Sequence, residues 1–120
     1  NPNDLSNITI PITLQELNSA NKIYLTLDIE KPDINNAYLL FQNILPVLKP
    51  QIVTACINDS AKCSDMPLKT CSDATSLNKV IQIQYSEQPL MNYKNNCLLI
   101  QGTQKDLIRQ VEALILAYRL

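Results

Sequence analysis

The sequence contains no histidine, no tryptophan and a single glycine, Gly102, among its 120 residues. Histidine is the usual general base of enzymes and the commonest metal ligand, so the most frequent catalytic and metal-binding side chain is missing. One glycine cannot build a glycine-rich phosphate loop or a dinucleotide-binding fingerprint, because both need several glycines at close spacing. The composition therefore excludes the common nucleotide-binding motifs and hydrolytic sites that depend on histidine.

The sequence also lacks an excess of either positive or negative charge. Ten basic and eleven acidic residues give a formal net charge of −1, and the eight lysines and two arginines are scattered along the chain. Binding to nucleic acid or to an anionic membrane surface normally requires a basic patch, which this sequence does not offer. No apolar run approaches the roughly 18 residues that span a bilayer, so we expect no membrane insertion.

The length of 120 residues fits one domain with its own core. We expect residues 1–120 to form that domain, with residues 1–7 as a loose polar N-terminus. The chain begins at Asn1 rather than at a methionine, shows no signal peptide, and ends inside its last helical pattern. We therefore expect a processed protein or an excised domain of a longer parent chain.

Several segments have the apolar pattern of β-strands. One segment, 51–57, is apolar on both faces, as expected for an interior strand that follows a helical crossover. Residues 8–14 also alternate, but Pro11 cannot donate to a strand ladder, so this segment is either an edge strand or an extended arm. The predicted strands are 23–29, 51–57, 80–85 and 97–100, the last two as a hairpin.

Two segments, 33–48 and 104–119, have apolar residues at the spacing of three and four that is typical of amphipathic helices. Pro46 removes a backbone hydrogen bond inside the first segment, so that helix should end or kink there. The order of strand, helix and strand predicts a parallel βαβ unit with a right-handed connection. We predict an α/β domain with a mixed sheet of four or five strands and two main helices.

The four cysteines, Cys56, Cys63, Cys71 and Cys97, form an even set without a CxxC motif. Four cysteines allow three disulfide pairings, and free buried thiols are a further alternative. We prefer Cys56 with Cys97, from strand to strand, and Cys63 with Cys71, closing the intervening loop. Zinc sites made of four thiolates usually come as two close pairs, and spacings of six, seven and 25 intervening residues do not fit them. We predict no metal and no cofactor.

Residues 58–78 have no sustained period and are predicted to form a long cysteine-containing loop. A structureless loop of this length is usually functional or conceals an unrecognised element. Asp65 and Asp73 each follow a Cys-Ser pair in this segment. Calcium loops present acidic residues in closer alternation, so we interpret both aspartates as turn or cap residues.

Two kinds of surface residue are candidates for function. Asn7 and Asn58 begin the sequons Asn-Ile-Thr and Asn-Asp-Ser, which are acceptors for glycosylation outside the cytoplasm. Gln82 and Gln84 alternate with apolar residues, so their face of the strand is either wet or contacts a partner. Tyr85 and Tyr93 flank the expected hairpin turn, where they either pack across strands or form an aromatic contact patch.

The last third of the chain carries three segments, Val80–Ser86, Asn95–Gly102 and Asp106–Ile108, by which it resembles the C-terminal part of small archaeal extracytoplasmic α/β domains of unknown function. The resemblance implies a location at the cell surface and brings no catalytic residues with it. The order of strand, helix, strand, loop, hairpin and helix also resembles a thioredoxin-type topology that lacks the active-site cysteine pair.

These features predict a disulfide-stabilised structural or partner-binding domain without enzymatic activity, located in an extracellular, cell-surface or periplasmic-type space. Its expected partner is a protein at the cell surface or another part of a larger parent chain, and not nucleic acid. One alternative is a thioredoxin-like thiol oxidoreductase, active or degenerate. Another is a small-ligand-binding domain that uses loop 58–78.

Overall fold

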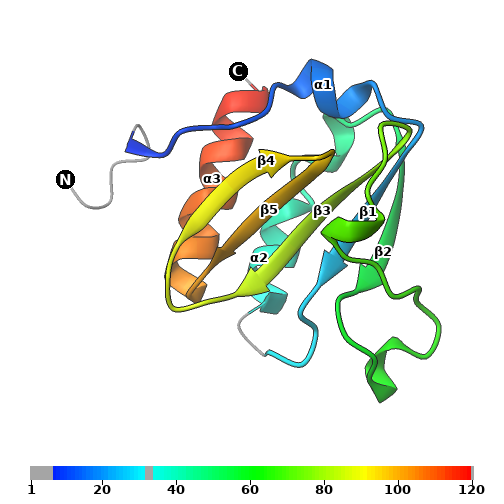
Figure 1. Ribbon diagram of the computed structural model, residues 1–120. Coiled ribbons are helices and arrows are strands. Elements are labelled where there is room, and N and C mark those ends of the chain that lie inside the picture. Colours follow the sequence, from blue (N-terminus) through cyan, green and yellow to red (C-terminus); the bar gives the residue numbers. More distant parts are fainter. Residues whose placement is uncertain (1–6, 32–33, 120) are drawn as a thin grey trace.

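The computed structural model describes residues 7–31 and 34–119, and it confirms an α/β fold with a five-stranded mixed sheet and two main helices (Figure 1). The elements are α1 (Leu14–Asn18), β1 (Lys22–Leu27), α2 (Ile34–Phe41), β2 (Gln51–Cys56), β3 (Asn78–Tyr85), β4 (Leu90–Lys94), β5 (Cys97–Gly102) and α3 (Gln104–Arg119), with short 3₁₀ turns η2 (Leu45–Val47), η3 (Ala61–Cys63) and η4 (Cys71–Asp73).

The strands lie in the order β2-β1-β3-β5-β4. The first four are mutually parallel, and β4 pairs antiparallel with β5 at one edge. The segment β1-α2-β2 is the parallel unit that the sequence predicts. The expected interior position of segment 51–57 is wrong, because β2 lies at an edge of the sheet. The finer expectation of a thioredoxin-like arrangement is not confirmed.

Strand β4, Leu90–Lys94, was not among the predicted strands. It is joined to β5 by Asn95 and Asn96, whose φ angles of 51° and 67° are the left-handed values of a two-residue hairpin turn. Asparagine tolerates these angles better than most residues, so it can replace glycine in this turn. The predicted hairpin between 80–85 and 97–100 is wrong, because these strands lie side by side in parallel.

Helices α2 and α3 pack together on one face of the sheet, behind the strands in Figure 1. Alternate residues of each strand point toward them and form the core, because side chains in a strand change face at every residue. The buried strand residues of this face include Ile23, Leu25, Leu27, Ile81, Ile83, Leu98 and Ile100, and the helices contribute Ile34, Ala37, Phe41, Leu107, Val111 and Leu114.

The helix ends follow local sequence signals. Helix α2 ends at Phe41, and Pro46 lies in the first turn of η2, so the predicted break before or at this proline is confirmed. The expected start at Asp33 lies outside the described residues. At α3, the backbone N–H of Thr103 donates to Asp106 Oδ2 at 3.0 Å, as expected for a capping box. Gly102 is required there, since an added Cβ would lie 2.5 Å from Asp106 Cβ.

The segment between β2 and β3 crosses the sheet face opposite the helices. The Thr26 hydroxyl of β1 donates to the carbonyl of Lys69 at 2.7 Å, which places the loop over β1 on that face. The connection from β1 to β2 crosses the helix face, and the connection from β2 to β3 runs in the opposite direction across the loop face. The two crossovers therefore have the same handedness. Loop 58–78 is therefore the second crossover, and it contains η3 and η4.

Residues 7–13 form an extended arm and no strand, which decides between the two alternatives for segment 8–14. The Tyr118 hydroxyl of α3 donates to the carbonyl of Ile12 at 2.8 Å, and burial raises the pKa of Tyr118, which keeps this donor protonated. Figure 1 shows the arm running across α3 toward α1. Of the predicted loose N-terminus, residues 1–6 lie outside the described residues.

Candidate functional site at the open sheet edge

All four cysteines are in disulfides, as predicted, but the preferred pairing is wrong. The bonds join Cys56 to Cys63 and Cys71 to Cys97. Each bond therefore links a strand residue to the loop, where we expected one bond between strands and one within the loop. The loop is attached to the sheet at two separate points.

Sheet order explains why Cys56 and Cys97 do not pair. Strands β1 and β3 lie between β2 and β5, so three interstrand spacings, about 14 Å, separate the strands that carry the two cysteines. Their side chains also point to opposite faces, because Cys56 is in register with Leu27 and Cys97 with Val80. A disulfide needs Cα atoms within about 7 Å of each other.

The disulfide between Cys56 and Cys63 closes the carboxyl end of the β2 edge. Both cysteines are buried, with 0% and 3% of their surface exposed. The backbone N–H of Cys56 donates to the carbonyl of Pro67, and the N–H of Lys69 donates to the carbonyl of Cys56, each at 3.0 Å. The loop thereby satisfies the outward-facing backbone groups at this end of the strand.

The disulfide between Cys71 and Cys97 attaches η4 to the sheet face opposite the helices. Next to it, the backbone N–H of Cys71 donates to Gln82 Oε1 at 2.9 Å, and Gln82 Nε2 donates to Gln84 Oε1 at 2.8 Å. Gln82 is buried, because the loop covers it. Of the residues proposed as an interaction face, Gln82 therefore holds the loop of its own chain, and Gln84 bonds to Gln82.

The other two proposed residues of that face lie elsewhere. Tyr85 is in register with Gly102, at the carboxyl end of the sheet, and Tyr93 is in register with Leu98, near the opposite end. Both are on the helix side, whereas Gln82 and Gln84 are on the loop side. The structure does not bring these four residues together on one face.

A buried polar cluster around Lys79 was not predicted. The Lys79 side chain is 1% exposed, and its ammonium donates to Tyr93 Oη at 2.7 Å, Glu16 Oε2 at 3.0 Å and Asn96 Oδ1 at 3.0 Å. A sequence signal existed, because Lys79 precedes the buried Ile81 by two residues and so points to the same face. The cluster links α1, β3, β4 and the β4–β5 turn.

Burial lowers the pKa of Lys79, but hydrogen bonds to Tyr93 and Glu16 outweigh this effect and hold the pKa above its ordinary value. The hydrogen bond from Lys79, and then that from Tyr93, lowers the pKa of Glu16. Both groups are therefore charged at neutral pH, and all three ammonium hydrogens have acceptors. This lysine stabilises the position of β4 and has no hydrogen left to donate to a ligand.

Strand β4 leaves backbone groups unpaired on its outer side. In an antiparallel pair closed by a two-residue turn, hydrogen-bonded and non-hydrogen-bonded residue pairs alternate, starting at the residues that flank the turn. Lys94 faces Cys97 next to the turn, so the N–H and C=O of Met91 and Tyr93 point away from β5. Within residues 7–31 and 34–119, no other backbone group bonds to them.

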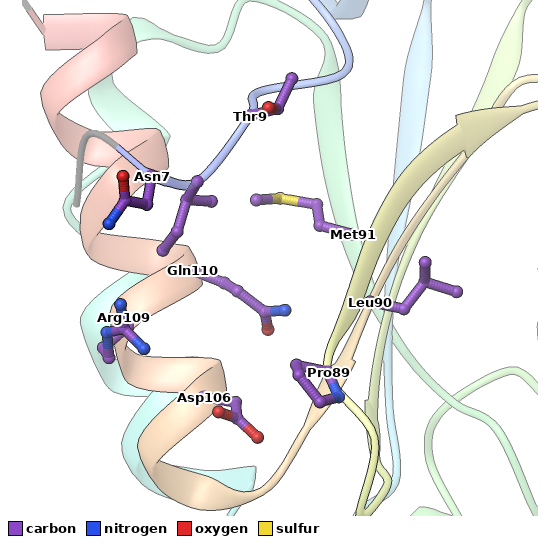
Figure 2. Close-up of a pocket in the computed structure, with 9 residues that line it drawn as sticks. Asn7, Thr9, Pro89, Leu90, Met91, Asp106, Arg109 and Gln110 are labelled. Carbon is purple, nitrogen blue, oxygen red and sulfur yellow. The ribbon is translucent and has the colours of Figure 1, made fainter. Parts of the chain in front are cut away.

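A pocket of about 350 Å³ lies beside the start of this strand, between β4, α3 and the N-terminal arm (Figure 2). Figure 2 shows Gln110 reaching from α3 toward Pro89 and Met91. Gln110 is 6% exposed, and its Nε2 donates to the carbonyl of Gln101 at 3.2 Å. Its Oε1 is buried without a hydrogen-bond partner in the described structure, as is Arg109 Nε. We call this pocket the β4 groove.

A second pocket of about 400 Å³ lies at the carboxyl ends of β1 and β2, between α2 and the cysteine loop. Lys62 and Met66 line it from the loop, so it corresponds to the predicted ligand site that uses residues 58–78. Its other lining residues are Leu27, Ile29, Lys31, Ile34, Asn35, Tyr38 and Thr54.

Other candidate residues are accounted for more simply. Asn7 and Asn58 of the two sequons are both exposed. Asp73 accepts a hydrogen bond from the backbone N–H of Thr70 at 2.9 Å, so it acts as a cap residue, as interpreted. In the described part of the chain, no three acidic or cysteine side chains gather where they could hold a metal. No helix among these residues is long and apolar enough to cross a membrane.

Comparisons of this chain with known protein families, with curated proteins and with solved structures give no match.

Proposed function

We propose that this protein is an extracytoplasmic domain that binds an extended segment of a partner protein by adding it as a strand to β4. The observation that carries the proposal is the outer side of β4, where the backbone groups of Met91 and Tyr93 have no partner among the described residues. In strand addition, main-chain hydrogen bonds supply affinity and neighbouring pockets supply specificity.

Two disulfides support the proposed compartment, because such bonds persist mainly in oxidising spaces outside the cytosol. The exposed sequons at Asn7 and Asn58 are consistent with this location. The resemblance to archaeal cell-surface domains agrees with the same compartment. A thiol oxidoreductase is less favoured, since it needs a reactive accessible thiolate and three of the four cysteines are buried.

Strand β4 is favoured over β2, the other edge strand, for two reasons. At β2, the loop already takes the outward groups of Cys56, and only Ile52 and Thr54 remain free of backbone partners in the described structure. At β4, the free groups adjoin a groove that contains a buried polar atom without a partner. Pro89 precedes β4 and Lys94 is its last residue, and both limit the added segment to the length of β4.

Selection from a displayed library of short random peptides tests this function. Met91→Pro removes the outward N–H without removing a bond to β5, whereas Met91→Ala keeps the N–H and shortens the side chain. We expect peptides selected on the original protein to bind Met91→Ala and to lose at least tenfold in affinity for Met91→Pro, in proportion to a lost main-chain bond of roughly 1.4 kcal/mol.

Thr54→Pro on β2 is the matched control, because it removes an outward N–H from the other edge. Peptides that bind Met91→Pro as well as the original protein would contradict strand addition at β4. Peptides that lose binding to Thr54→Pro instead would place the site at β2.

A second candidate function is binding of a small apolar anion in the pocket beside the cysteine loop. Its walls include Ile34, Tyr38 and Met66, and Lys31 and Lys62 supply positive charge. Fluorescence titration with an anilinonaphthalene sulfonate probe tests it, with Lys62→Met as the variant and Lys105→Met as the control. Saturable binding that only Lys62→Met weakens supports this site, and no binding contradicts it.

A further inference from the structure

We infer that the β4 groove selects a partner segment with a neutral, hydrogen-bond-donating side chain, Asn, Gln, Ser or Thr, at the position opposite Met91. This inference rests on the proposed strand addition. It follows from the groups that the groove presents and from the register that an added strand must adopt.

The unpaired Oε1 atom of Gln110 is the reason why the partner side chain should be a hydrogen-bond donor. Because Gln110 Nε2 donates to the carbonyl of Gln101, the orientation of the amide is fixed and Oε1 is the atom left unpaired. A buried acceptor without a donor is unfavourable, and an apolar group placed against it would leave it so. A side chain that brings an N–H or O–H into the groove removes this penalty.

The charges of the groove favour a neutral side chain. Asp106 and Arg109 both line it, one acidic and one basic, so it carries no net charge. Asp106 Oδ2 already accepts hydrogen bonds from the backbone N–H and the hydroxyl of Thr103. A basic side chain would lose its hydration to meet an Asp106 carboxylate that already accepts two hydrogen bonds. An acidic side chain has no hydrogen to donate to Gln110 Oε1, so it would leave this acceptor unpaired.

The register of an added strand on β4 determines where the partner's side chain lies. Met91 is paired with Ile100, whose side chain is buried on the helix side of the sheet. Residues directly opposite each other in neighbouring strands share a face, so the residue that pairs with Met91 from an added strand also points to the helix side. Figure 2 shows Met91 and Gln110 on facing walls of the groove, where this side chain would enter.

The occupant is a segment of a partner polypeptide, because only a chain fills both features at once. Its backbone meets the row of outward groups on β4, and its side chain meets the unpartnered atom Gln110 Oε1.

Peptide selection on the original protein and on two groove variants tests the inference. On the original protein, we expect one peptide position to be enriched in Asn, Gln, Ser or Thr. Gln110→Met keeps the size of the side chain but removes the acceptor, so the preference at that position should change to apolar residues. Gln110→Glu places a carboxylate there, and the preference should change to Lys or Arg.

The outcomes separate the inference from the function on which it rests. Apolar or charged residues at that position in peptides for the original protein, or an unchanged preference in both Gln110 variants, would overturn the inference. Strand addition would still stand if Met91→Pro abolished the binding of those peptides. Failure to enrich any peptide, or self-association of the original protein through β4 in sedimentation experiments, would overturn both.

Discussion

The two edges of the sheet differ in what lies beside them. At β2, the disulfide between Cys56 and Cys63 holds a loop whose backbone pairs with the end of the strand. At β4, the outward groups of Met91 and Tyr93 have no such cover in the described structure. An uncovered edge is a template for pairing with another chain. The comparison teaches that the cysteine loop closes part of one edge and leaves the other edge available.

Removal of the disulfide between Cys71 and Cys97, which attaches the loop to the sheet face, should cause the largest loss of stability. Replacing Cys71 and Cys97 together by alanine removes a disulfide with a sequence separation of 26. We expect the free energy of unfolding to fall by about 3–4 kcal/mol, because the unfolded chain regains the entropy that the bond restricts. Urea denaturation measures this loss, and a change below about 1 kcal/mol would show that the loop is held without the bond.

Removing the bond beside β2 should make the two edges more alike. The double variant Cys56→Ala/Cys63→Ala opens a shorter loop, with a sequence separation of 7, so we expect a smaller loss of about 2–3 kcal/mol. It should also expose the end of β2 and cause concentration-dependent association. Sedimentation of both double variants checks this difference, and association of the Cys71/Cys97 variant alone would contradict it.

Loss of the Lys79 cluster should destabilise β4 and leave β2 unaffected. Lys79→Met removes three hydrogen bonds that reach α1, β4 and the following turn, and we expect a loss of about 1–2 kcal/mol in unfolding free energy. Faster amide exchange should be confined to the β4–β5 hairpin. Lys105→Met, at an exposed position of α3, is the control and should change neither measurement.

The smallest effect is expected from pH. The pKa of Glu16 is lowered in the folded protein, so its stabilising contribution is present above the ordinary pKa of 4.5 and is lost as pH falls through the folded value. Acidification below pH 4.5 should therefore lower the melting temperature less in Glu16→Gln than in the original protein. Glu112→Gln, exposed on α3, should follow the original protein, and identical curves for all three proteins would contradict the role of Glu16.

Local patterns predicted most elements of the fold. Strands 23–29 and 80–85 and helix 104–119 have periodic apolar residues, and strand 51–57 is a short apolar run; both patterns depend only on neighbours in sequence. Strand β4 has no clear apolar alternation in the sequence, because at the edge of the sheet its side chains alternate only between exposed and half-buried. Its hairpin turn uses Asn95 and Asn96 in place of glycine.

The candidate site depended on information that sequence patterns do not carry. The disulfide pairing follows from strand order, which places β1 and β3 between Cys56 and Cys97. Gln110 is a polar residue of the last helix, and its burial beside the arm and β4 depends on tertiary packing, which the helical pattern does not show. Only Lys79 had a usable signal, its two-residue spacing from Ile81.

Amide hydrogen exchange of β4, measured residue by residue by NMR, tests the central claim most directly. The account predicts that in the free protein the N–H groups of Met91 and Tyr93 exchange rapidly while that of Asn92, which faces β5, is protected. A selected peptide should then slow exchange at Met91 and Tyr93. Protection of Met91 and Tyr93 in the free protein, or no change in their exchange when the peptide binds, would contradict the claim that this edge is open and receives a partner strand.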